Sequence, residues 1–402
     1  MLHKRLQPRM YRRDIFPAEA TVLPFQEKAA SLKPEREWNG KAAKKSGLSP
    51  WVILKLTFMY VYSIHIVSNA IAGSIRTSSL SYIIETLTYT VRSLVSTVTT
   101  TYFVVKASEL SGITDELAQF EGVQPTKLLE RAASKRRYLR FSIVCYSCLL
   151  IAMTVLFFVL VPAQKYFDKC FYGIDLARAG IPNGPAILIG LIEWDSYNVL
   201  VTGSPVLMTN YIYLCDYLRA QMLGFRASVR AVLDSGPLNV TKFEKVRTMC
   251  TRLIDVERRL DSLFAPAVLL WFVDLLVNIV LPIRTLINGI ASFTLANVMS
   301  FFIEVIYSVS FFMILSFSLA QVDKEYKEIE EETFRLRTSV ATEDWQLCQQ
   351  VTLLESNINS SKFTLTGWGL FEVDRSFILT IVGAVATYTV VLIQLTPGQD
   401  TY

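Results

Sequence analysis

The sequence SFILTIVGAVATYTVVLIQL, residues 376–395, carries no charged side chain over its whole length. A helix of this length rises about 30 Å, which matches the thickness of the hydrocarbon core of a bilayer. The run also lacks the charged face that a helix on the surface of a soluble domain shows. It therefore predicts a transmembrane helix.

Further long apolar runs precede it, at residues 51–73, 80–105, 139–162, 186–214, 263–283 and 297–320. The 402-residue chain is 52% hydrophobic and only 19% charged, and its apolar residues gather in these runs. The run at 80–105 contains Glu85 and Arg92, so we expect that span to face protein or water on one side. We predict an all-α polytopic membrane protein with seven transmembrane helices.

The distribution of basic residues between the spans predicts the orientation of the chain. Lys and Arg number 32 in the segments on the N-terminal side of the membrane and 5 in those on the other side. Because basic residues accumulate in cytoplasmic loops, we expect a cytoplasmic N-terminus and an extracellular C-terminus. This orientation is the reverse of a G-protein-coupled receptor, and neither a DRY-like triplet nor an NPxxY motif is present at the usual places.

We divide the chain into four parts. Residues 1–50 form a basic cytoplasmic segment, and 51–320 a six-helix region for ligand binding with cytoplasmic helical extensions. Residues 321–372 are expected to form cytoplasmic anchor helices, and 373–402 a pore-lining seventh span with a short extracellular tail. Residues 215–262 predict a charged helical hairpin that continues spans four and five below the membrane. These extensions are either a subunit-assembly domain or charged surface helices, and their pattern fits both.

Several other classes of function find little support. The net charge of +5 is spread between the apolar runs rather than along one stripe, which disfavours nucleic-acid binding. His3 and His65 are the only histidines, so we predict no metal and no cofactor. No catalytic set converges at one membrane depth, so we predict no enzyme. A transporter of a small polar solute is the weaker rival, because no inverted repeat is visible.

The last span resembles the signature of the arthropod gustatory receptors, which is Thr-Tyr, five hydrophobic residues, Gln and Phe. Here Thr387-Tyr388 is followed by five apolar or small residues and Gln394. Leu395 replaces the final Phe, which is similar to the ending of the related odorant co-receptors. Before the span, Gly369-Leu370-Phe371 suggests a short turn, and Asp374 is a candidate helix N-cap.

The resemblance implies a homo- or heterotetrameric, ligand-gated, non-selective cation channel in the plasma membrane of chemosensory neurons. It implies that a small tastant, a sugar or a bitter compound, opens the channel, and that membrane lipid surrounds it. A co-receptor subunit of a heteromeric odorant or gustatory channel is the alternative. The seventh helix of each subunit is expected to line one central pore.

The spacing of the last span agrees with a pore-lining role. Small or polar residues recur every three or four positions along one face, at Thr380, Ala384, Thr387, Val391 and Gln394. We predict that Val391, Gln394 and Leu395 form the gate and that Thr387 lines the pore below it. The alternative is that Gln394 hydrogen-bonds a neighbouring helix and the threonines bond back to their own helix. Tyr388 is expected to pack into the subunit.

Ionisable and aromatic residues within the spans are the candidates for ligand binding. They are Glu85, Glu193, Trp194, Asp195, Tyr197, Asp274 and Glu304. Carboxylates beside aromatic faces suit sugars or small cationic compounds. Glu193 and Asp195 fit an interfacial position equally well, and Asp274 is alternatively a partner of Arg92 or Arg284.

Overall fold

The protein is described by a computed structural model over residues 49–77, 80–118, 126–160, 183–234, 240–289, 295–339, 345–360 and 365–395. It divides into two compact units, Met1–His65 and Ile66–Tyr402, and the division falls within helix α2, Pro50–Thr77. In the first unit, the backbone carbonyl of Ser49 accepts the amides of Val52 and Ile53, so Pro50 occupies the first helical turn. The ring of Tyr62 stacks on Phe58 and contacts His65.

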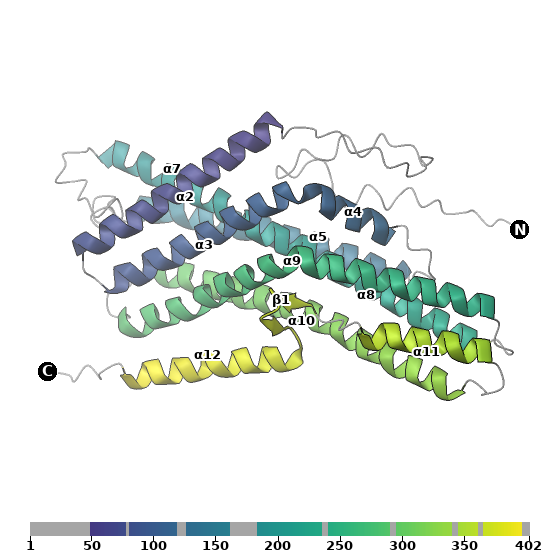
Figure 1. Cartoon of the computed structure of the whole chain (residues 1–402). Coiled ribbons are helices and arrows are strands. Elements are labelled where there is room, and N and C mark those ends of the chain that lie inside the picture. The colour runs from purple at the N-terminus through teal and green to yellow at the C-terminus, as the bar shows by residue number, and fades with distance from the viewer. Residues whose placement is uncertain are drawn as a thin grey trace, which may run out of the picture. The chain divides into compact units, whose positions relative to one another are not determined.

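The second unit is almost entirely helical over its described residues (Figure 1). Its helices are α3 (Leu80–Val105), α4 (Ala107–Ala118), α5 (Thr126–Leu160), α7 (Asn183–Val201), α8 (Gly203–Asp234), α9 (Val240–Gly289), α10 (Leu295–Ser339), α11 (Trp345–Ser360) and α12 (Arg375–Leu395). The strands β1 (Thr366–Gly367) and β2 (Phe371–Glu372) form a small antiparallel hairpin. The prediction of an all-α fold is therefore confirmed, with this hairpin as an addition.

Over the described residues, each predicted span lies on helix, with one difference; residues 161–162 of the third span lie outside them. The span at 186–214 is divided at Thr202 into α7 and α8. Pro205 has no backbone N–H to donate to Val201, which weakens the helix at this point. Gly203 also lies so close to α3 that an added Cβ would be 2.9 Å from the hydroxyl of Thr100. The break thus lets α8 approach α3 closely.

By length and composition, the stretches Pro50–Ile75, Phe243–Leu281 and Phe302–Arg335 are long and apolar enough to cross a membrane, and Arg375–Val391 is a shorter apolar helix. The helical stretches within α9 and α10, of 39 and 34 residues, are longer than the hydrocarbon core of a bilayer is thick. Residues 243–262 of α9 carry nine charged side chains, so they lie outside the hydrocarbon region. Helices α8 and α9 thus form the predicted charged hairpin, and α10 runs without interruption past residue 320.

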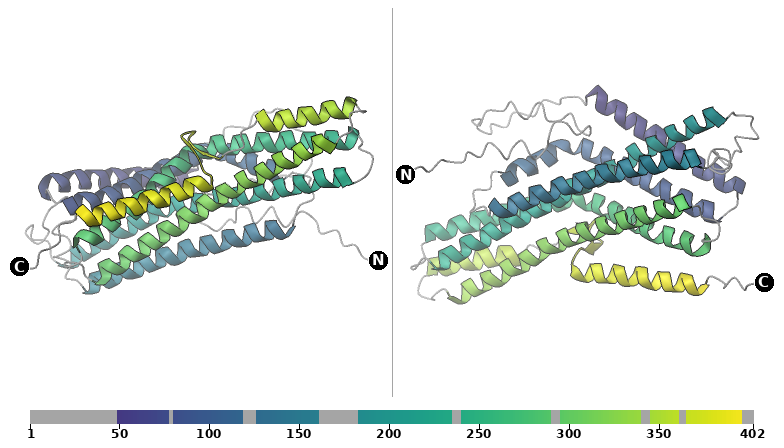
Figure 2. Two further views of the ribbon diagram at one scale, coloured as in Figure 1. Left: turned by 90° about the horizontal axis from the view of Figure 1, so that it is seen from below. Right: turned by 180° about the vertical axis from the view of Figure 1, so that it is seen from behind.

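Helix α9 is the centre of the second unit. It packs against α3, α4, α8, α10, α11, α12 and β1 (Figure 2). Its most buried side chains include Val268 and Trp271. The indole ring of Trp271 contacts the rings of Phe103, Tyr211 and Phe264. A change in the position of α9 would therefore alter its packing against all of these elements.

Candidate functional site

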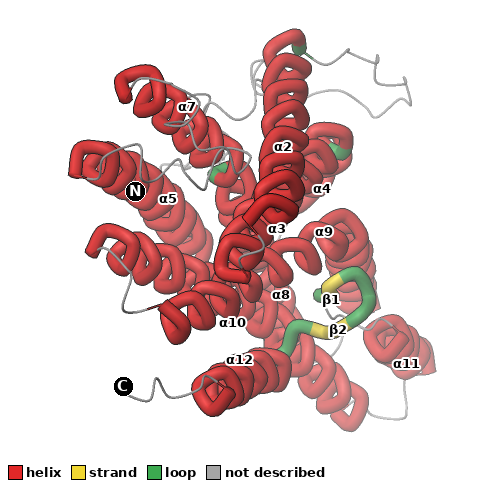
Figure 3. Tube along the Cα trace, turned by 90° about the vertical axis from the view of Figure 1, so that its left-hand side faces the viewer, coloured by secondary structure: helices red, strands yellow, loops and turns green. Residues whose placement is uncertain are grey.

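A buried polar cluster joins α3, α5, α7, α9 and α10. In Figure 3 these helices are seen from the end that carries the C-terminus. At the centre of the cluster, Nη1 of Arg92 on α3 donates to Oε1 of Glu304 on α10 at 2.6 Å. The side chains are 6% and 19% exposed. A charge-assisted pair of this kind holds the two helices together at a fixed point along their length.

Tyrosine rings surround this ion pair. Tyr146 and Tyr307 stack with centroids 3.8 Å apart, and Tyr89 meets Tyr197 edge to face at 5.1 Å. The guanidinium of Arg92 is within electrostatic range of Tyr146, Tyr197 and Asp274. The rings therefore enclose the charges and limit the access of water.

Asp274 is the second carboxylate of the cluster. It is 5% exposed, and its Oδ1 accepts from Nδ2 of Asn278, one turn further along α9, at 2.9 Å. Arg92 pairs with Glu304 instead of Asp274. Among the described side chains, no cation lies within ion-pair distance of Asp274; the side chain of Arg284, its other expected partner, is outside them.

The structure brings together three of the predicted ligand residues, Tyr197, Asp274 and Glu304. Glu85 lies on α3 and Glu193, Trp194 and Asp195 on α7, but their side chains are outside the described residues. The sequence prediction missed Tyr146 and Asn278 as members of the cluster. The spacing of Asn278 from Asp274 by four residues was a usable signal, whereas nothing local marks Tyr146.

Helix α12 presents the second functional surface. Its inner side, which includes Ile378, Val385 and Tyr388, is buried or half-buried against α9 and α10, as predicted for Tyr388. The predicted stripe is uncovered over its whole length: Thr380, Ala384, Thr387, Val391 and Gln394 are all exposed. Leu395 ends the helix, and its side chain is outside the described residues.

The hydroxyls on this stripe bond to their own helix. Oγ1 of Thr380 donates to the carbonyl of Ser376, and Oγ1 of Thr387 to that of Gly383, each at 2.9 Å. This is the alternative arrangement considered for the threonines. The oxygen lone pairs of both hydroxyls remain available to water, so the bonds do not conflict with a water-facing position.

The β1–β2 hairpin connects α12 to α9. The backbone amide of Thr366 donates to Oδ1 of Asp261 at 2.7 Å, and that of Trp368 to the carbonyl of Ala265 at 3.0 Å. Trp368 and Gly369 have positive φ angles of 52° and 70°, which the tight reversal requires. The predicted turn at Gly369-Leu370-Phe371 is thus part of a registered hairpin.

The start of α12 is fixed in two ways. Oδ1 of Asp374 accepts the amide of Phe377 at 2.7 Å, which confirms the predicted N-cap. The ring of Phe377 stacks on Phe371 at 4.7 Å, and both rings contact Phe272 of α9. These ring contacts join α9 directly to the first turn of α12.

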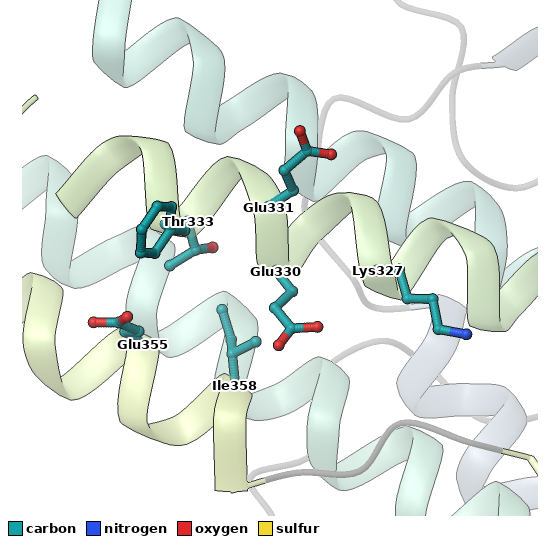
Figure 4. A pocket seen from close by; sticks show the side chains of 7 residues that line it. Lys327, Glu330, Glu331, Thr333, Glu355 and Ile358 are labelled. Carbon is teal, nitrogen blue, oxygen red and sulfur yellow. The ribbon is translucent and has the colours of Figure 1, made fainter. Parts of the chain in front are cut away.

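A cavity of about 490 Å³ lies between the charged parts of α10 and α11, apart from the polar cluster and from the exposed stripe on α12 (Figure 4). It is lined by Lys327, Glu330, Glu331, Thr333, Phe334, Glu355 and Ile358. Glu331 is paired with Arg335 at 2.6 Å, and Glu355 with Arg337 at 2.7 Å. Two of the carboxylates that line the cavity are therefore already paired with arginines.

Comparison with known proteins places the chain in a family. The family model described as 7tm Chemosensory receptor matches residues 48–396. A search of curated proteins gave no match.

Two solved structures of the olfactory receptor OR5 from the insect Machilis hrabei share the fold. The complex with eugenol has a TM-score of 0.71 and 14% identity, covering 86% of this chain and 89% of the receptor. A second structure of OR5 has a TM-score of 0.65 and 14% identity, with coverage of 90% and 93%. At this identity the likeness concerns the fold. Since the family model spans nearly all of the predicted membrane region, the chain belongs to the seven-transmembrane chemosensory receptor family.

Proposed function

We propose that the protein is a gustatory receptor that acts as a tetrameric, ligand-gated, non-selective cation channel in the plasma membrane. The observation that carries the proposal is the stripe on α12. Helix α12, which carries no charged residue after Arg375 at its start, packs one face on α9 and α10 and leaves small and polar residues uncovered on another. In a bilayer, polar groups are favoured where they face protein or water rather than lipid.

Four copies of this face around a common axis would enclose a pore. Thr387 would supply hydroxyl oxygens to water in the pore, and the exposed Val391 would form an apolar ring nearer the outer end. An apolar constriction closes a pore by excluding water, and a small outward movement of the helices reopens it. Gln394, together with Leu395 at the end of the helix, completes the proposed gate.

The polar cluster is the proposed ligand site, and α9 would connect it to the pore. Asp274 lies on α9 two residues from Phe272, whose ring is 5.2 Å from Phe377 at the base of α12. A ligand that binds Asp274 or breaks the Arg92–Glu304 pair would shift α9 relative to α3 and α10. Because α12 contacts α9 through this ring, the shift would change the tilt of the pore helix.

The test is current from outside-out patches of expressing cells under a panel of sugars and bitter compounds. We expect ligand-evoked cation currents with no nucleotide or G protein present. Val391→Ala, which widens the apolar ring, should raise the leak current without ligand, and Gln394→Ala should change rectification. The control is Val385→Ala, on the half-buried side of α12, which should leave rectification as in the wild type.

Absence of current from surface-expressed protein, together with saturable uptake that follows an ion gradient, would instead favour the transporter. A co-receptor role is the second candidate, because Leu395 replaces the Phe of the gustatory signature. In that case current should appear only when a related receptor subunit is expressed in the same cell.

A further inference from the structure

Asp274 is a buried carboxylate without a cationic partner in the described part of the chain. Its oxygen Oδ1 accepts from Asn278 at 2.9 Å, while the guanidinium of Arg92 is directed to Glu304 at 2.6 Å. The described charges of the cluster are therefore one guanidinium and two carboxylates, with a net charge of −1. An ionised carboxylate buried in this way is strongly unfavourable unless a positive group or a proton compensates it.

Two further acceptors belong to the same cluster as Asp274. Oδ1 of Asn278 and the hydroxyl of Tyr307 are buried and have no hydrogen-bond partner among the described residues. Asn278 bonds Asp274 directly, and Tyr307 is within its electrostatic range. A carboxylate, an amide carbonyl and a phenol oxygen together match the three N–H donors of a primary ammonium group.

The aromatic surroundings favour the same kind of ligand. Tyr307 is stacked on Tyr146 within the cluster, and Tyr307 is within electrostatic range of Asp274. The negative face of an aromatic ring attracts an organic cation, and the attraction is larger where water is excluded. A neutral polyol would fill hydrogen bonds here but would leave the charge of Asp274 uncompensated.

We propose that the cluster binds the protonated amino group of a small primary amine, with Asp274 as its counter-ion and Asn278 and Tyr307 as further acceptors. This inference rests on the proposed function only in taking the cluster as the ligand site. Among the small tastants of the proposed function, the inference assigns cationic compounds to this site. The Arg92–Glu304 pair then serves to position the wall of the site.

The experiment measures binding rather than current, on the full-length protein in lipid nanodiscs. Thermal unfolding is followed at pH 7 with 2-phenylethylamine and butylamine, and with the matched neutral alcohols 2-phenylethanol and 1-butanol. We expect the amines to raise the Tm in a saturable way and the alcohols to have little effect. Equal effects of amine and alcohol, or no effect of either amine, would overturn the proposal.

Asp274→Asn tests the role of the charge. The substitution keeps the shape of the side chain, and it should raise the Tm of the ligand-free protein because it removes the uncompensated charge. It should weaken the apparent affinity for the amines at least about tenfold. The matched control is Asp323→Asn, a buried aspartate in the charged extension that pairs with Lys327 and should leave amine binding unchanged.

An unaltered affinity in Asp274→Asn would contradict the proposal. If that variant does not fold, the comparison of amines with alcohols on the wild-type protein still decides. Binding of amines without any current, also when a related receptor subunit is expressed in the same cell, would refute the channel but not the amine site. Currents evoked by neutral compounds and by amines to the same extent would refute the amine site but not the channel.

Discussion

At the scale of single residues, Gly367 and Glu257 show how local chemistry supports the junction between α9 and α12. Gly367 is in β1, where the ring of Phe371 lies over its Cα. Glu257 is in the charged part of α9, one turn before the aspartate that holds the hairpin, and is 2% exposed. Substitution at each position should change the stability of the protein, for a different physical reason.

Gly367→Ala should destabilise the protein. An added Cβ would be 2.2 Å from Cζ of Phe371, and that ring is stacked on Phe377 and cannot withdraw freely. We expect a loss of about 2 kcal/mol in the free energy of unfolding, measured by thermal unfolding of the purified protein. Gly112→Ala in α4 is the control: its Cβ meets no atom within 4 Å, so better helix propensity should stabilise by about 0.5–1 kcal/mol. A similar effect of both substitutions would contradict the steric argument.

Glu257 should make stability depend on pH. Burial raises the pKa of Glu257 to about 8, with a further increase from the Asp261 carboxylate and an opposing effect of Arg258. The folded state therefore holds a proton that the unfolded chain releases at its ordinary pKa of 4.5. The resulting stabilisation is fully present below pH 4.5 and is lost as the pH rises to about 8.

Glu257→Gln should accordingly flatten the decline in Tm between pH 5 and pH 9 and raise the Tm at pH 9. The effect should be on the order of a few kcal/mol at the upper end of this range. Asp255→Asn, which alters an exposed carboxylate on the same helix, should retain the wild-type slope. A Glu257→Gln variant with the wild-type slope would show that this group stays ionised in the folded protein.

At the scale of elements, the charged extensions of α8 and α10 are joined by an ion-pair network. Arg226 on α8 donates to Glu325 and Glu332 of α10 at 2.9 Å each, and also to Glu328. Arg219 contacts Glu325 and Gln321 one turn earlier on α10. The network joins α8 and α10 over several turns, so these two extensions pack on one another within the chain.

Arg226→Ala should therefore be costly, because it leaves three carboxylates with reduced compensation. We expect a loss of about 2–3 kcal/mol in stability, partly relieved at high salt. Arg335→Ala removes an exposed pair with Glu331, where both side chains are more than 60% exposed, and should change stability by less than about 0.5 kcal/mol. Chemical denaturation at two ionic strengths measures both effects; equal losses would argue against the network.

At the scale of the whole molecule, the proposal requires several copies of a 45.5 kDa chain to meet along α12. The exposed Leu379, Val382 and Val390 extend the uncovered face beyond the polar stripe. A helix with this much unburied apolar surface fits contact with lipid or with a second copy. The two possibilities differ in stoichiometry, which can be measured directly.

Mass measurement in nanodiscs should give a tetramer. With the exposed Cys145 and Cys148 first replaced by serine, Ala384→Cys should form disulfide-linked dimers under mild oxidation, because this residue lies on the uncovered face. Thr389→Cys, on the half-buried side of the same helix, should remain monomeric on a denaturing gel. A monomeric mass, or equal cross-linking of both variants, would refute assembly through this face.

The sequence determined the features that depend on neighbours along the chain. Apolar runs and the 3.6-residue period predicted the helices, the charged hairpin and the stripe on α12, and the position of Asp374 just before the last apolar run predicted the cap. Each of these arises from interactions within one or two helical turns. The same information therefore suffices to predict them.

Only the tertiary structure decided which distant groups meet. Arg92 pairs with Glu304, 212 residues away, instead of Asp274, and Asp261 holds a hairpin that begins 105 residues later. The periodicity of apolar residues does not predict such pairs, because the rotation and axial position of each helix follow from packing against all of its neighbours. The candidate ligand site consists of these long-range pairs, whereas the exposed stripe on α12 belongs to one helix. For that reason the sequence predicted the stripe but not which residues of the cluster meet.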